Sequence, residues 1–148
     1  MISSNQYQDI EIQQHSDFTN TITFDVAHTM LTTFKYAAVI AKDYDHTAFI
    51  GPNKATGADG THANDDVWNQ ASVNVVQFDL IADISAKTVT LTLPAKATRF
   101  FTDDFEGVWD LVEMDDITND VYIRQIQGDV VISKGVTRII TDTFKVAA

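Results

Sequence analysis

Histidines and carboxylates are the residues of this chain whose side chains could support acid–base or nucleophilic chemistry. The four histidines, His15, His28, His46 and His62, lie far apart, and no two have the i, i+4 spacing of a helical zinc pair. No serine occupies a Gly-x-Ser-x-Gly elbow. We therefore predict isolated histidines in solvent-exposed loops, with no catalytic residue among them.

Carboxylates cluster in two places, at Asp103, Asp104 and Glu106, and at Asp115, Asp116 and Asp120. A pair of flanking carboxylates serves glycosidases, and a hard cation such as calcium binds similar oxygens, but the ordered spacing of a calcium loop is missing. Aspartates that hydrogen-bond their own backbone in turns explain both clusters more simply. The sequence therefore predicts no enzyme, no cofactor and no metal site, and leaves a cation at the acidic loops as the alternative.

The overall charge argues against nucleic acid as a partner. The chain of 148 residues has a formal net charge of −11, and its ten Lys and Arg are scattered singly. Solubility explains the acidity, and an acidic face meeting a basic partner or a cation is the alternative. Cysteine is absent, no apolar run is long enough to span a membrane, and no signal segment is recognisable. We expect synthesis in a reducing host cytoplasm.

Alternation of apolar and polar residues predicts an all-β fold. In Thr88–Leu93, for example, Val89 and Leu91 share one face and the threonines share the other. The predicted strands are 7–12, 18–24, 33–42, 72–84, 88–93, 108–114, 121–133 and 137–146. Short strands separated by turns are typical of an antiparallel β-sandwich of the immunoglobulin-like, Greek-key type. We predict a single domain over residues 1–148 with an extended N-terminal arm.

Two segments interrupt the strand pattern. Pro94 ends a strand, and the residues after it predict one short helical turn that plugs an end of the sandwich. Residues 51–66 hold three glycines and a proline, which predicts a long inserted loop. Such a loop is either an arm that contacts a neighbouring subunit or an unstructured insertion.

The tryptophans and one glycine stand out as structural markers. Trp109 shares a face with Leu111, which predicts a core position. Trp68 has no such stripe, so we predict an exposed interface side chain there, together with His62, Asp65 and Asp66. Gly128 lies on the apolar face of its strand, and we predict that a bulky ring from the facing sheet, Trp109 being the candidate, lies over it.

Several short motifs resemble a family of small β-sandwich proteins found in the virions of tailed bacteriophages. They are a first strand over residues 11–18, with His15 where the family has glycine, Thr90-Leu91-Thr92-Leu93-Pro94 followed by Thr98, Trp109-Asp110-Leu111, and Gly128 with Val136-Thr137-Arg138. This family is similar in fold to the N-terminal modules of baseplate and receptor-binding proteins. Residues 51–68 have no counterpart in it.

The resemblance implies a virion structural protein without catalytic residues. The expected role is an adaptor of the tail, baseplate or fibre attachment that contacts other virion proteins and its own copies in a symmetric homo-oligomer. A capsid decoration or head–tail joining protein is the alternative. A host-glycan-binding module is a third hypothesis, in which Trp68 acts with Asp65, Asp66, Asn69 and Gln70.

Overall fold

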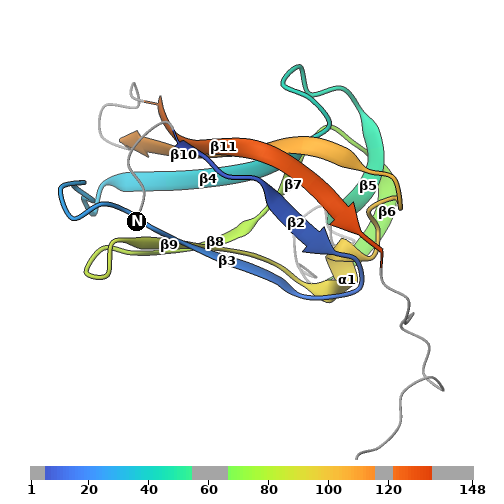
Figure 1. Cartoon of the computed structure of the whole chain (residues 1–148), viewed down its shortest axis with the longest axis horizontal. Helices are drawn as coiled ribbons and strands as arrows, with labels where there is room; N and C mark the ends of the chain where they lie inside the picture. Colours follow the sequence, from blue (N-terminus) through green and yellow to red (C-terminus); the bar gives the residue numbers. More distant parts are fainter. Residues whose placement is uncertain (1–5, 55–66, 116–121, 135–148) are drawn as a thin grey trace, which may run out of the picture.

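Two β-sheets packed face to face form the body of the protein (Figure 1). The computed structural model describes residues 6–54, 67–115 and 122–134. The large sheet consists of β1 (Gln6–Tyr7), β2 (Ile10–Gln13), β4 (Phe34–Ala41), β7 (Val76–Gln77), β10 (Glu106–Asp115) and β11 (Tyr122–Ser133). The small sheet consists of β3 (Phe18–Thr23), β8 (Asp79–Asp83) and β9 (Thr88–Leu93). A separate hairpin, β5 (Phe49–Lys54) with β6 (Trp68–Val73), and the helix α1 (Ala95–Thr98) complete the described fold.

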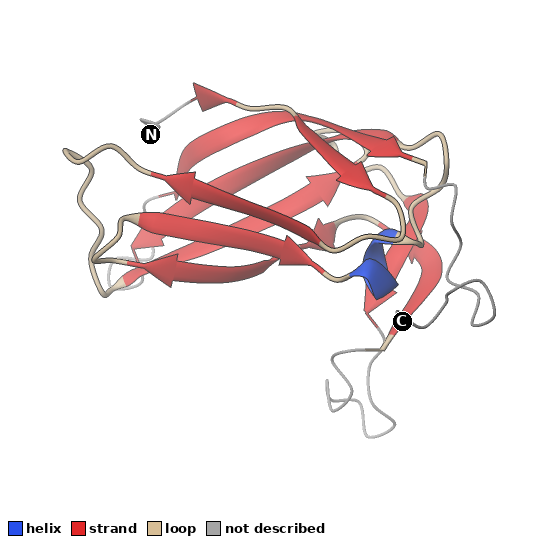
Figure 2. Ribbon diagram, turned by 60° about the horizontal axis from the view of Figure 1, so that its bottom comes forward, coloured by secondary structure: helices blue, strands red, loops and turns tan. Residues whose placement is uncertain are grey.

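The order of the strands confirms the predicted sandwich. The small sheet runs β3-β9-β8, while the large sheet runs β1-β11-β10-β4-β7 with β2 also paired to β11. Successive strands are thus divided between two sheets, as in a β-sandwich. The pairs are antiparallel except at β11, where β1 and β2 run parallel to it. Figure 2 shows the two layers from a second direction.

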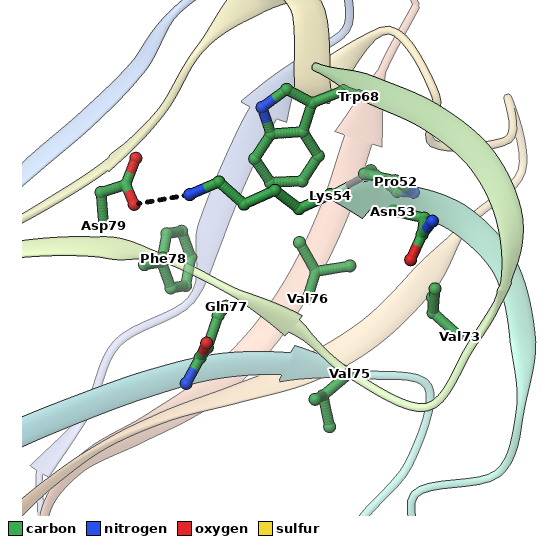
Figure 3. A pocket seen from close by; sticks show the side chains of 10 residues that line it. All are labelled: Pro52, Asn53, Lys54, Trp68, Val73, Val75, Val76, Gln77, Phe78 and Asp79. Carbon is green, nitrogen blue, oxygen red and sulfur yellow. Dashed lines mark ion pairs between the residues drawn. The ribbon is translucent and has the colours of Figure 1, made fainter. Parts of the chain in front are cut away.

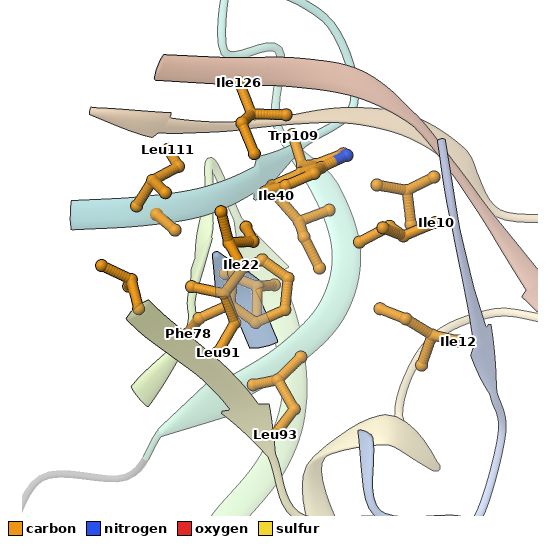
Figure 4. Packing of buried hydrophobic residues seen from close by; sticks show 14 of the residues in the cluster. Ile10, Ile12, Ile22, Ile40, Phe78, Leu91, Leu93, Trp109, Leu111 and Ile126 are labelled. Atoms are coloured by element: carbon orange, nitrogen blue, oxygen red, sulfur yellow. The ribbon is translucent and has the colours of Figure 1, made fainter. Parts of the chain in front are cut away.

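Alternation along each strand separates the core from the surface. In β9, Val89, Leu91 and Leu93 are buried, and the threonines between them face outward. The side chains that fill the space between the sheets include Ile12, Ile22, Ile40, Leu91, Leu93, Trp109, Leu111 and Ile126 (Figure 4). Val130 belongs to the same buried cluster. Phe78 meets the Trp109 ring edge-on with centroids 6.3 Å apart. The core position predicted for Trp109 is confirmed, with 1% of it exposed.

The prediction for Gly128 is correct about a close approach and wrong about the group that approaches. Trp109 is the cross-strand neighbour of Gly128 in the same sheet, not a ring from the facing one. A Cβ at Gly128 would overlap the backbone carbonyl of Gln8, which lies between β1 and β2. The Gln8 carbonyl turns inward to accept a hydrogen bond from Trp109 Nε1 (2.7 Å), and the Asp129 amide bonds the Asp9 carboxylate instead (2.9 Å). Glycine is needed here because backbone occupies the space of a side chain.

The predicted strand at 72–84 and the predicted loop at 51–66 need correction. Residues 72–84 form the end of β6, then β7, then β8, so this stretch crosses from the hairpin to the large sheet and on to the small one. Gly51–Lys54, predicted as part of the loop at 51–66, belong to β5, and residues 55–66 lie outside the described part. The strand predicted at 137–146 also lies outside it.

The helical turn predicted after Pro94 is confirmed as α1. Its first amide, on Ala95, donates to the carboxylate of Asp17 (2.7 Å), which lies far away in sequence at the start of β3. Thr98 is fully buried, and its hydroxyl donates to the Ser16 carbonyl (2.8 Å). The helix therefore closes one end of the sandwich, which we call the hairpin end because β5 and β6 lie there too (right in Figure 1). The opposite end, where β10 finishes, we call the polar end.

Candidate functional site

The β5–β6 hairpin is attached to the sandwich by aromatic packing. The ring centroids of Phe49 and Phe105 lie 4.8 Å apart, and those of Phe105 and Phe101 lie 5.2 Å apart. All three are buried, so apolar contacts hold the hairpin against the sandwich. The side-chain amide of Gln70 adds one polar tie, donating to the Phe100 carbonyl (3.0 Å).

A cavity of about 240 Å³ opens between the hairpin and the chain that runs through β7 into β8. Its lining comprises Pro52, Asn53, Lys54, Trp68, Val73, Val75, Val76, Gln77, Phe78 and Asp79 (Figure 3). The lining therefore combines an indole ring and aliphatic side chains with two amides, one ammonium and one carboxylate. Convergence of a few polar groups on an apolar pocket is the usual composition of a small-molecule site.

Lys54 connects the two sides of this cavity. Its Nζ lies 5.8 Å from the centre of the Trp68 ring and 3.8 Å from Asp79 Oδ1. Lys54 is 32% exposed and Asp79 is 61% exposed, so both charged groups are accessible to a bound molecule. Because water screens such a pair, it contributes little to stability and breaks at little cost.

A second group of polar side chains lies at the polar end, around the buried carboxylate of Glu113. Glu113 is only 4% exposed, and its Oε2 accepts a hydrogen bond from the Tyr36 hydroxyl (2.6 Å). His28 Nε2 lies 2.8 Å from the same oxygen, and the His28 ring stacks on Phe24 with centroids 4.6 Å apart. Burial, followed by the bond to Glu113 and its negative charge, raises the pKa of Tyr36 far above its usual value. The Tyr36 phenol therefore stays protonated and donates; it is not a ready nucleophile.

Lys87 ties the loop between β3 and β4 to this group. Lys87 Nζ donates to the carbonyl of His28 (2.7 Å) and also to that of Val26. Its own backbone has φ of 55° in the turn between β8 and β9. The Glu113 group thus joins segments that are distant in sequence, and we interpret it as a structural cluster that closes the polar end.

The positions of the predicted interface residues in the structure differ from the prediction. Trp68 is half-buried and packs against the core, so its predicted exposure is wrong, although it does line the cavity. His62, Asp65 and Asp66 lie outside the described residues. Asn69, predicted as a glycan contact with Gln70, accepts a hydrogen bond from Asn53 Nδ2 (2.9 Å). The cavity groups that the sequence missed, Lys54 and Asp79, come from separate strands, and no spacing in the sequence signals their approach.

The other candidate residues stay apart, with one exception. His15 and His46 lie in different turns with φ of 69° and 57°, whereas His28 is half-buried beside Glu113 instead of exposed as predicted. Within residues 6–54, 67–115 and 122–134, no three His, Asp or Glu side chains gather as metal ligands would. Over the same residues, no helix has the length and apolarity needed to cross a membrane.

No protein-family model matches the chain, and no curated protein sequence matches it.

Proposed function

We propose that the protein is a non-enzymatic structural subunit of a tailed-bacteriophage virion, serving as an adaptor in the tail, baseplate or fibre attachment. The sequence motifs that resemble such proteins support this proposal through the positions they occupy. His15, which replaces the family's glycine, has a left-handed backbone with φ of 69°, a conformation that glycine adopts without strain. Gly128, another of these motifs, lies where only a glycine leaves room for the Gln8 backbone.

The observation that supports the proposed role is the exposed apolar surface on the outer face of the large sheet. Side chains with large exposed apolar surface lie on it: Tyr7 is 74% exposed and Val131 is 44% exposed. Tyr44, 58% exposed, lines a shallow hollow together with Val39 and Val108. Tyrosine is enriched in protein interfaces because its rigid ring covers much area at a small entropic cost.

Carboxylates surround these side chains. Glu11, Glu106 and Asp129 are exposed on the same face, as the strand register and alternation place them. With a net charge of −11, a second copy meeting this face directly would be repelled. The face therefore suits a more basic virion protein, while copies of the chain meet around the symmetry axis of the assembly through other surfaces.

Mass spectrometry of purified virions tests the proposal. The chain should be present in particles, in tens of copies or fewer for a tail or baseplate role; hundreds of copies would instead indicate capsid decoration. A protein found only in infected-cell lysates, never in particles, would remove the virion role altogether.

Matched surface variants test the face. Tyr7→Asp should reduce incorporation into particles when it replaces the wild-type chain, because it adds charge to the proposed contact. Ile81→Asp is the control, since Ile81 is 70% exposed on the outer face of the small sheet. Equal incorporation of both variants would exclude the large-sheet face as the contact.

A further inference from the structure

We propose that the cavity beside Trp68 binds the ring of a neutral hexose. This inference goes beyond the virion role, because it concerns a small-molecule site and is tested on the purified chain without particles. It replaces the glycan contact patch predicted from sequence with groups that the structure brings together: Trp68, Lys54 and Asp79.

The first argument is the pairing of flat apolar surface with polar groups. A pyranose ring has a face of C–H groups that packs on an indole ring, and hydroxyls around its rim. The half-buried Trp68 indole supplies the apolar surface, and Val76 and Phe78, which are 3% and 5% exposed, also line the cavity (Figure 3).

The second argument is the mixture of donors and acceptors. Each sugar hydroxyl donates one hydrogen bond and accepts others, so a sugar site needs both kinds of partner. The Lys54 ammonium is a donor, the Asp79 carboxylate is an acceptor, and the amide side chain of Gln77 carries both functions. Hydrogen bonds to charged groups are the stronger kind, so Lys54 and Asp79 should contribute most.

Charge and size narrow the class of ligand. The charges of Lys54 and Asp79, 3.8 Å apart, offset each other, and the chain as a whole has a net charge of −11. An acidic sugar would therefore be repelled by the protein without an uncompensated cation to hold it. The volume of about 240 Å³ falls below the roughly 300–1,000 Å³ of sites for drug-sized ligands, which suits a single ring.

The experiment is a titration of the ¹⁵N-labelled protein with sugars, followed by ¹H–¹⁵N correlation NMR. The probes are the methyl glycosides of glucose, galactose, mannose and N-acetylglucosamine, each at millimolar concentration, with glucuronate and N-acetylneuraminate as charged controls. At least one neutral glycoside should bind saturably and shift the indole N–H signal of Trp68 with the backbone amides of residues 53, 54 and 77–79. The indole N–H of Trp109 is an internal control, since it is buried and bonded to Gln8.

Matched variants assign the binding to the cavity. Asp79→Asn and Lys54→Met keep most of the side-chain volume, and each should weaken binding by about tenfold through loss of a charge-assisted hydrogen bond. Asp103→Asn is the control, because Asp103 forms a similar surface pair with Lys134 (3.7 Å) away from the cavity, and it should leave the affinity unchanged.

The length of the sugar ligand distinguishes a glycan from a free sugar as the natural ligand. Oligosaccharides of the best-binding sugar that bind more tightly than its methyl glycoside would identify a glycan, and equal affinity would identify a free sugar; both support the proposed chemistry. Absence of saturable binding by all four neutral glycosides, preference for the acidic controls, or unchanged binding by Asp79→Asn and Lys54→Met would overturn it.

Discussion

The two ends of the sandwich are closed by different physical means. At the polar end, the buried carboxylate of Glu113 on β10 is hydrogen-bonded to Tyr36 and His28, so these polar groups already bond one another inside the structure. At the hairpin end, Phe49 and Phe105 do the packing, and the charged Lys54 and Asp79 remain at the surface beside a cavity. The charged groups of Lys54 and Asp79 thus stay available for a ligand, whereas the polar groups around Glu113 are bonded to one another inside the structure. The predictions below test this difference.

The largest effect is expected at the hairpin end from Phe105→Ala. Removing this ring, which contacts Phe49 and Phe101, should lower the free energy of unfolding by about 3–5 kcal/mol. Urea denaturation measures the change, and Leu31→Ala at a half-exposed position is the control, expected within about 0.5 kcal/mol of wild type. A loss below about 1 kcal/mol for Phe105→Ala would show that aromatic packing does not hold this end.

Glu113→Gln should have the next largest effect, at the polar end. The amide keeps the shape of the side chain but weakens the acceptor for Tyr36 and His28, which should lower the free energy of unfolding by about 2 kcal/mol. Glu106→Gln is the matched control, since Glu106 is exposed on the same strand, and it should change stability by less than about 0.5 kcal/mol. Equal denaturation midpoints for the two variants would contradict the role assigned to Glu113.

Substituting glycine at two residues with left-handed backbone, one near each end, compares how far their side-chain contacts stabilise the two ends. His15 near α1 and Lys87 at the polar end both have positive φ, so glycine relieves backbone strain at each. Lys87→Gly also removes the bonds from Nζ to the Val26 and His28 carbonyls. We expect Lys87→Gly to be less stable than His15→Gly by about 1 kcal/mol in the same denaturation assay. The reverse order would mean that the Lys87 contacts do not stabilise the polar end.

A pH-dependent effect, which grows in alkali, involves Tyr36. Its pKa is raised in the folded state by burial and by Glu113, so above about pH 10 the unfolded chain releases a proton that the folded one keeps. Stability from this group is therefore full below pH 10 and falls as pH rises above it. Tyr36→Phe should flatten the alkaline fall in thermal midpoint, while Tyr44→Phe, at an exposed tyrosine, should not.

Local patterns in the sequence were sufficient to predict most of the strands and part of the core. Alternation in Thr88–Leu93 and the shared face of Trp109 and Leu111 report burial directly, because side chains alternate between the faces of a sheet. The stretch 72–84 misled the same method, since three short strands of separate sheets follow one another there with little sign of the crossings. Gly51 and Pro52 also suggested a loop, although pairing with β6 holds them in a strand.

The candidate sites were harder to predict, because tertiary contacts create them. The sequence around His28 does not indicate that it contacts Glu113, and the sequence around Lys54 does not indicate that it contacts Asp79. Gly128 was recognised as a position of close approach, but identifying the approaching group required the path of the chain at Gln8. Residue type therefore indicated which positions mattered, while their partners depended on topology.

The pairing of the first strands with the last one has a consequence for how the chain folds. Gln6 pairs with Ile126 and Ile10 with Val130, so the edge of the large sheet joins segments from opposite ends of the described chain. Contacts of such long sequence separation slow folding, because a long loop must close before any of them forms. During synthesis, β1 and β2 must wait until β11 has left the ribosome, and the sheet keeps an unpaired edge until then. This edge of the large sheet is thus completed only after residues 122–133 have been synthesised.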